Sequence, residues 1–265
     1  MRRLHWLVVG LMFVGGEAFA GRPLVIDDAD PVDAGQFEFE AGEKYIKFSD
    51  CRHWDYPVGL TYGLVSGVEV GLGFGGQYET RREFMHEAGF ENICEESGIG
   101  DLAVGAKWQF VKESDYMPRQ ALVPSVKFPT ADKDNGLGSG EIDYDITWIA
   151  SKSLTDKMGA HINAGYSWIG EAAGQNVGNI LHYGLAVDCQ ISTSVQLVGE
   201  VFADRELRGD TDTAVQYNAG FRWRPADCLT LDMAGGSKIS GDVPDFTVTA
   251  GLTLAFGSNN NNKKE

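Results

Sequence analysis

Apolar and polar residues alternate with a period of two through the last patterned stretch of the chain, residues 246–256. Small or polar residues stand between the apolar positions, which are Phe246, Val248, Ala250, Leu252, Leu254 and Phe256. This period predicts a β-strand with two unlike faces. A length of about ten residues, with an aromatic residue at each end, is typical of a strand that crosses a bilayer at a tilt.

The same alternation recurs along the chain and predicts twelve strands. They span residues 35–48, 54–64, 68–78, 102–110, 122–128, 142–148, 158–168, 181–189, 195–203, 213–223, 229–233 and 246–256. These strands predict an all-β fold, a 12-stranded antiparallel transmembrane β-barrel of the bacterial outer membrane that covers residues 35–256. Two strands are less regular. The alternation blurs near Gly42, which predicts a bulge, and Val198 and Phe202 fall on the same face as Glu200.

The connections between these strands alternate in length. Longer polar connections follow odd-numbered strands (80–97, 130–140, 170–178, 204–212, 237–245), and mostly shorter ones follow even-numbered strands (65–67, 151–156, 189–193, 224–228). This rhythm is typical of a barrel with short periplasmic turns and long outer loops. Aromatic residues fall at both ends of the predicted strands and form two girdles. A soluble β-sandwich also alternates, but it has no reason to arrange loops and aromatic residues in this way.

The two ends of the chain lie outside the predicted wall. Residues 1–20 hold two arginines, a short apolar run and the sequence Ala18-Phe19-Ala20, which predicts a signal peptide removed before Gly21. Residues 21–34 form a periplasmic N-terminal segment without a strand pattern. We hypothesise that it turns into the periplasmic mouth as a plug, its aspartates meeting Arg222 or Arg224. Residues 257–265 form a flexible polar tail.

Composition narrows the class of protein. The mean hydropathy is -0.19, and after the signal peptide no long apolar run follows, which excludes a helical membrane protein but not a barrel. The formal net charge of -16 argues against nucleic acid as a partner. Outside this exclusion, the acidic balance is mainly a solubility feature.

Four cysteines, Cys51, Cys94, Cys189 and Cys228, belong to a chain predicted to be exported. An even number in an oxidising compartment indicates two disulfides, and the sequence alone allows three pairings. The predicted topology puts Cys51 and Cys94 in outer loops and the other two in periplasmic turns. We therefore predict the bonds Cys51–Cys94 and Cys189–Cys228, because any other pairing would have to cross the membrane.

The polar face of the strands is predicted to line the lumen, since charge is costly on the lipid side. Its charged and histidine residues are Glu69, Asp101, Lys107, Lys127, Glu141, Asp143, Asp145, His161, His182, Asp188, Glu200, Arg222 and Asp232. Counting from the connections puts Lys127 opposite Asp143 and Arg222 near Asp232, which predicts ion pairs that hold the wall. Twelve strands predict a narrow pore. Inward-facing glycines, such as Gly71 and Gly105, keep it clear.

Two other classes of function compete with a channel. An outer-membrane lipid-modifying enzyme needs a nucleophile, a histidine and an orienting group together at the lipid surface. His161 and His182 face the lumen several residues out of register, so we expect no catalytic triad, no metal site and no cofactor. A barrel with a purely structural role would carry no ion current.

Several stretches carry a resemblance to a known family. They are residues 22–30 (RPLVIDDAD), 35–40 (GQFEFE), 98–107 (GIGDLAVGAK) and 127–131 (KFPTA). The chain resembles the outer-membrane channel family that is named for its association with the meta-cleavage pathway of phenol degradation. The resemblance covers essentially the whole chain after residue 20.

This resemblance implies a channel or transporter for small solutes, aromatic or other hydrophobic compounds among them. The partners it implies are outer-membrane lipids, the barrel assembly machinery and a small-molecule solute. The oligomeric state and the direction of transport are left open. One departure concerns assembly: the terminal aromatic residue, Phe256, is followed by the polar tail rather than by the end of the chain.

Overall fold

The computed structural model describes residues 21–49, 51–85, 90–171, 177–209 and 211–257, with only the backbone given for the strand residues between 81 and 94. The predicted signal peptide and residues 258–265 of the predicted tail therefore lie outside the described residues. Within these described ranges there is no helix long and apolar enough to span a membrane.

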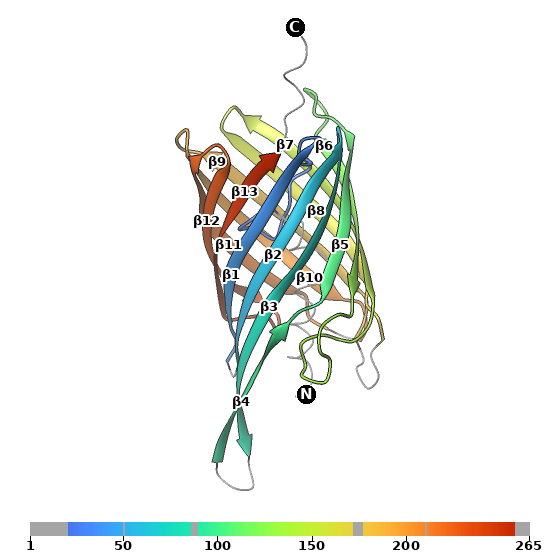
Figure 1. The fold of residues 1–265 in the computed structure, drawn as a ribbon, viewed down its shortest axis with the longest axis vertical. Coiled ribbons are helices and arrows are strands. Elements are labelled where there is room, and N and C mark those ends of the chain that lie inside the picture. The colour runs from blue at the N-terminus through green and yellow to red at the C-terminus, as the bar shows by residue number, and fades with distance from the viewer. Residues whose placement is uncertain (1–20, 50, 86–89, 172–176, 210, 258–265) are drawn as a thin grey trace.

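The described ranges contain thirteen β-strands in one sheet. They are β1 (Gln36–Lys47), β2 (Cys51–Val65), β3 (Val68–Met85), β4 (Phe90–Ile99), β5 (Leu102–Val111), β6 (Arg119–Phe128), β7 (Asp143–Thr155), β8 (Met158–Trp168), β9 (Ile180–Gln190), β10 (Val195–Glu206), β11 (Ala214–Ala226), β12 (Leu229–Ser240) and β13 (Phe246–Gly257). Neighbouring strands pair antiparallel, and β1 pairs with both β2 and β13, so the sheet closes on itself (Figure 1).

Two of these strands share one position in the wall. β3 pairs with β5 from Val68 to Gly73 and with β4 from Gly76 to Met85. β4 and β5 are thus successive parts of one strand of the barrel, interrupted at residues 100 and 101. The closed barrel has twelve strands around its wall, as the alternation predicted.

The faces of the barrel are the reverse of those of a soluble protein. Leu185 is 57% exposed on the outer surface, whereas Glu200 is only 5% exposed inside. Trp108, Trp223 and Phe256 are exposed at one end of the wall, and Trp168 and Tyr217 at the other. Because apolar side chains are stable against acyl chains and charges are not, the outer surface suits a membrane. The predicted orientation of the two faces is confirmed.

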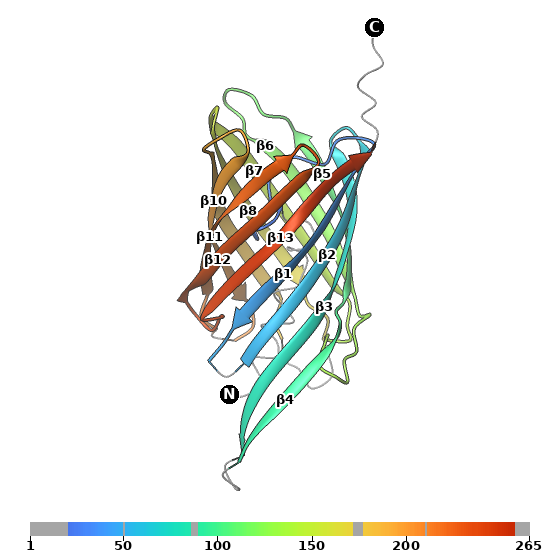
Figure 2. The same cartoon turned by 60° about the vertical axis from the view of Figure 1, so that its left-hand side comes forward.

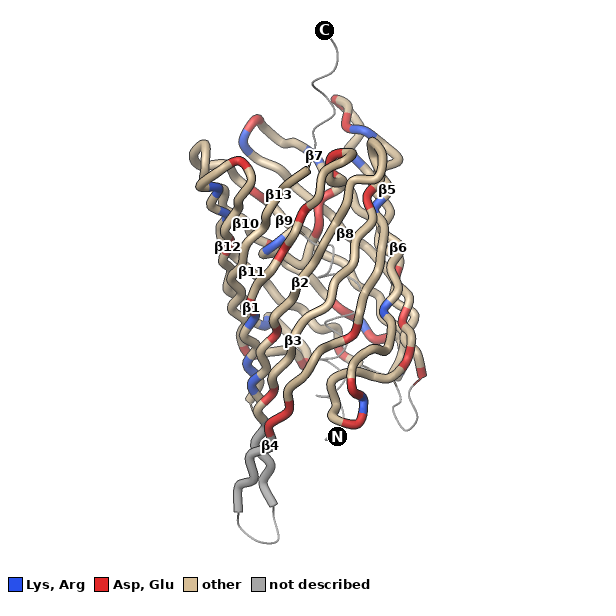
Figure 3. The backbone as a smooth tube through the Cα atoms, viewed as in Figure 1, with Lys and Arg blue, Asp and Glu red and all other residues tan. Residues whose placement is uncertain are grey.

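A ribbon formed by β3 and β4 extends far beyond the rest of the wall (Figures 1 and 2). Acidic residues lie at its base, and both acidic and basic residues occur at the two ends of the barrel (Figure 3). The prediction of a loop over residues 80–97 is therefore wrong. Its sequence has no regular alternation of apolar and polar residues, so the pattern could not reveal the two paired strands.

Two local predictions also need correction. The pairing of β1 with β13 runs through Gly42 without a register shift, so the predicted bulge is absent from β1. Glu141 precedes β7, which begins at Asp143, and so does not lie on the barrel wall.

The predicted Cys189–Cys228 disulfide is wrong. Both cysteines are free thiols: Cys189 lies in β9, and Cys228 lies in the turn between β11 and β12. At least two strand spacings of about 4.8 Å each separate them, whereas the Cα atoms of bonded cysteines lie within about 7 Å. The side chain of Cys94 lies outside the described residues, so the Cys51–Cys94 bond stays a prediction.

We expect both free thiols to be alkylated by iodoacetamide in urea without any reductant. Mass spectrometry of the tryptic peptides would measure the modification at Cys189 and Cys228. Recovery of the two unmodified peptides linked as one disulfide species would contradict the structure.

Candidate functional site

Residues 21–34, called the inner segment below, lie inside the barrel (Figure 1). From Gly35, just after the inner segment, back to Ala29, the chain passes five neighbouring strands. Gly35 N–H donates to Gly63 of β2 (2.8 Å), and Val32 N–H donates to Glu69 of β3. Gln109 of β5 donates to the Ala29 carbonyl (2.9 Å), Arg119 of β6 pairs with Asp30 (2.8 Å), and Ala29 N–H donates to Ser151 of β7 (2.9 Å).

The path continues around the wall in strand order. In β8, the side-chain amide of Asn163 is assigned the orientation that satisfies both of its ends. Its nitrogen then donates to the Asp27 carbonyl (2.9 Å), and its oxygen accepts the Asp27 N–H (2.8 Å). Glu200 of β10 accepts the N–H groups of Val25 (2.9 Å) and Ile26 (2.8 Å). The remaining contacts, to β11, β12, β13 and β1, are made by Gly21 and Arg22. The inner segment therefore lines the bore as a ring.

Apolar packing holds the same segment. Leu24 and Ile26 pack with Ala186 and Val198, and Phe202 packs against this cluster. Val198 and Phe202 are the two residues that broke the alternation of their strand. They face the bore because they meet apolar side chains of the inner segment there. The irregularity in the sequence was thus a signal of an internal partner.

A shaped pocket in the wall receives the Arg22 side chain. Its Nη2 lies 3.2 Å from Asp232 Oδ1 and donates to Thr249 Oγ1 (3.1 Å). A Cβ atom added at Gly42 would lie 2.3 Å from Nη2, and one added at Gly251 would lie 2.4 Å from it. Both positions must therefore lack a side chain for the guanidinium to reach Asp232.

We expect Gly42→Ala to displace Arg22 and loosen the inner segment by about 1 kcal/mol, at the low end of the cost of overpacking. Faster hydrogen exchange of the Val25 N–H would report the loosening. Gly199→Ala is the matched control, since its added Cβ would lie 3.7 Å from the Asn218 carbonyl oxygen, an ordinary contact. Equal exchange in both variants would contradict this account of the pocket.

One lysine side chain, that of Lys107, pairs with two carboxylates at the inner segment. Lys107 Nζ lies 2.7 Å from Asp27 Oδ2 and 3.6 Å from Glu69 Oε1, and all three side chains are buried. Burial, only partly offset by Lys107, raises the pKa of Asp27 to about 7. The negative charge in this cluster exceeds what Lys107 balances.

Two histidine networks lie on the wall. His161 Nδ1 is 2.9 Å from Ser151 Oγ, and His161 Nε2 is 2.8 Å from Asp188 Oδ2. His182 Nε2 is 2.8 Å from Asp145 Oδ2. The expectation of no catalytic triad rested on the register of the two histidines alone, so the Ser151-His161-Asp188 arrangement was missed. The short turn after β7 could have indicated it, because it puts Ser151 directly opposite His161.

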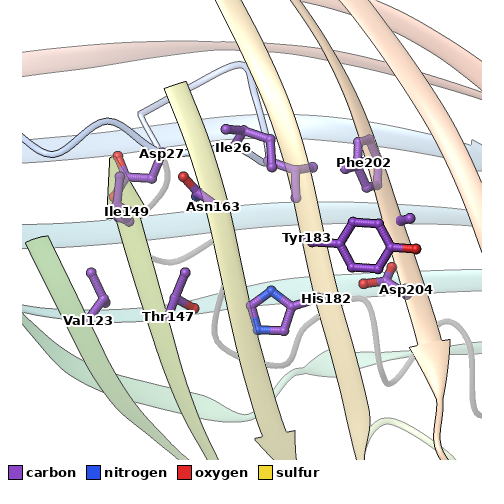
Figure 4. A pocket seen from close by; sticks show the side chains of 12 residues that line it. Ile26, Asp27, Val123, Thr147, Ile149, Asn163, His182, Tyr183, Phe202 and Asp204 are labelled. Carbon is purple, nitrogen blue, oxygen red and sulfur yellow. The ribbon is translucent and has the colours of Figure 1, made fainter. Parts of the chain in front are cut away.

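A small hollow of about 50 Å³ lies between the inner segment and the outer ends of β9 and β10. Figure 4 shows its lining, in which the apolar side chains of Ile26, Ile149 and Phe202 lie near the polar side chains of His182 and Asp204. Charged groups such as Glu69, Lys107 and Glu200 are buried elsewhere inside the barrel, whereas this hollow is lined by apolar and polar side chains together.

The predicted ion pairs of the wall are formed only in part. Lys127 lies opposite Asp143 as predicted, with Nζ 2.7 Å from the carboxylate, and it also pairs with Asp101 (3.1 Å). Arg222 is opposite Asp232 in register, but the Asp232 carboxylate pairs with Arg22 instead.

The aspartates of the inner segment pair with other cations than the sequence predicted. Arg222 donates to the carbonyls of Arg22 (2.6 Å) and Gly21 (2.7 Å), not to a carboxylate. Asp27 and Asp30 pair with Lys107 and Arg119, so the expectation that these aspartates meet Arg222 or Arg224 is wrong. The sequence could not choose among these cations, because the path of the inner segment around the bore leaves no period in the sequence.

Solved structures of outer-membrane barrels share this fold. The COG4313 outer membrane channel from Pseudomonas putida F1 is 12% identical, with a TM-score of 0.70 over 86% of this chain and 98% of that chain. The NanC porin is 10% identical, with a TM-score of 0.57 over 82% of this chain and 98% of that chain. The translocator domain of the autotransporter NalP from Neisseria meningitidis is 12% identical, with a TM-score of 0.54 over 86% and 91%.

No curated protein matches the chain in sequence. A family model does match, over residues 20–256. The apolar outer surface, the closed barrel and the fold shared with outer-membrane channels place the protein in the bacterial outer membrane. The family is described as "Putative MetA-pathway of phenol degradation", and this chain belongs to it.

Proposed function

We propose that the protein is an outer-membrane channel for small solutes, aromatic or other hydrophobic compounds among them, and that the inner segment is its plug. The observation that carries the proposal is the ring of contacts by which residues 21–34 follow the inside of a closed barrel. A wall with polar groups inside and apolar groups outside suits a water-filled passage.

The hollow above the inner segment supports the class of solute. Once the side chains around this small hollow move apart, an aromatic ring would contact Ile26 and Phe202 there, and its polar substituent would meet His182. The family description, which refers to phenol degradation, agrees with such a solute. The COG4313 protein and the NanC porin, which share the fold, are a channel and a porin rather than enzymes.

A lipid-modifying enzyme is less well supported, although Ser151, His161 and Asp188 are in contact. Ser151 is 0% exposed, and its Oγ already accepts the N–H of Ala29. A nucleophile must reach its substrate, and this serine faces the bore beneath the inner segment rather than the lipid. We infer that the network anchors the plug.

Single-channel recording in planar bilayers tests the proposal. Purified protein that begins at Gly21 should give discrete current steps, and benzoate added on the outer side should shorten them. Phe202→Ser should weaken this block without abolishing the current. Folded protein that carries no current would contradict a channel and favour a structural barrel.

Two partners belong to the same proposal. The outer apolar surface needs outer-membrane lipids, and insertion of a closed barrel implies the barrel assembly machinery. Phe256, exposed near the end of β13, is the residue we propose the machinery recognises, although a polar tail follows it. Replacing Phe256 with Ala should lower the amount of protein assembled in the membrane.

A further inference from the structure

The backbone of Gly21 is held inside the bore from two sides. Its nitrogen donates to Asp27 Oδ1 at 3.3 Å, and its carbonyl accepts from Arg222 Nη2 at 2.7 Å. Asp27 in turn is only 7% exposed. The nitrogen of residue 21 therefore lies next to a buried carboxylate.

That carboxylate lacks a full counter-charge. Asp27 shares Lys107 with Glu69, at 2.7 and 3.6 Å. Arg222 also lies nearby, but its guanidinium donates to the Gly21 and Arg22 carbonyls and to Gln196 (3.1 Å). A further cation next to Asp27 would be stabilised, which agrees with the raised pKa of this group when residue 21 is an ordinary amide.

The predicted signal-peptide cleavage would create such a cation. Hydrolysis of the Ala20–Gly21 bond adds one water, leaves a carboxylate on Ala20 of the released peptide, and leaves an amine on Gly21. An α-amino group has a pKa of about 8 and so takes up a proton at neutral pH. A hydrogen bond from a charged donor is roughly twice as strong as one from a neutral amide.

We propose that the α-ammonium group of Gly21, formed when a signal peptidase removes residues 1–20, binds Asp27 inside the bore and locks the inner segment there. Before cleavage the same position offers Asp27 only a neutral N–H. Removal of the signal peptide thus adds the missing counter-charge, and closure of the bore is coupled to maturation of the chain.

The reactivity of the amine toward acetic anhydride tests the proposal without reference to transport. The purified membrane-assembled protein is first shown by N-terminal sequencing to begin at Gly21. At neutral pH its α-amine should be acetylated about tenfold more slowly in the folded protein than in urea, as expected for a pKa raised by about one unit. Asp27→Asn should restore the fast rate.

Two controls separate the proposed contact from general protection. Asp30→Asn removes an aspartate that pairs with Arg119 at the mouth and should leave acetylation slow. A protein with one extra alanine before Gly21 moves the amine by about 3.8 Å and should react fast even if Asp27→Asn does not fold. A first residue other than Gly21, or a wild-type amine that reacts as fast folded as unfolded, would overturn the proposal.

Discussion

Deleting residues 22–33 is expected to raise the single-channel conductance several-fold. The deletion joins Gly21 to Ala34 ahead of β1 and removes no residue of the wall. It removes the contacts that pass from Glu69 around to Glu40, together with the ion pairs of Arg22, Asp27 and Asp30. The conducting cross-section then grows toward that of an empty 12-stranded barrel, which is wide enough for a narrow aqueous pore.

Planar-bilayer recording at fixed salt would measure this change. Lys238→Ala is a suitable control, because its ion pair with Asp245 (2.8 Å) lies at the outer edge of the barrel and both side chains are exposed. Unchanged conductance in the deletion variant would mean that the inner segment does not limit the current, and the plug would have to be abandoned while a channel could remain.

Replacing Lys107 with methionine is expected to lower the free energy of unfolding by about 3–5 kcal/mol, the range for removing one partner of a buried ion pair. Methionine keeps most of the volume of the side chain. It leaves Asp27 and Glu69 buried without the ammonium group that lies 2.7 and 3.6 Å from them. Urea titration of the protein in lipid vesicles, followed by tryptophan fluorescence, would measure the loss.

The triple variant Lys107→Met, Asp27→Asn, Glu69→Gln is the control for charge. It removes both carboxylates together with their partner, so much of the lost stability should return. Arg119→Met, which removes a half-exposed pair with Asp30, should cost less than 1 kcal/mol. A Lys107→Met protein as stable as the wild type would show that these carboxylates are balanced by other groups.

The wall of the barrel could be predicted from the sequence because its strands repeat one alternation, of apolar residues that face lipid and polar residues that face the bore. β8 has the predicted bounds, Met158–Trp168, since its apolar residues stay on one face to both ends. β4 could not be found in the same way, because its sequence lacks a regular alternation and the strand pairs with β3 alone. Alternation therefore detects burial against lipid, not strand pairing itself.

The interior of the barrel was less predictable, for a different reason. Lys127 and Asp143 were predicted correctly because they are neighbours across a hairpin. Arg22 and Asp232 were not, because only the completed barrel brings them together. Val198 carried a signal that was not used: it is an apolar residue among inward polar ones, and it packs against Leu24 and Ile26 inside the bore.

The ring of contacts also determines the order of assembly. Arg22 and Asp232 are 210 residues apart, and Val25 and Glu200 are 175 apart, so neither contact can form until almost every strand is in place. If these contacts formed early, the chain between their partners would lose conformational entropy, and no local contact would offset that loss. The N-terminal residues, which leave the ribosome ahead of every strand, are thus among the last to reach their native position. They can enter a finished barrel from its periplasmic end, where Gly35 joins them to β1.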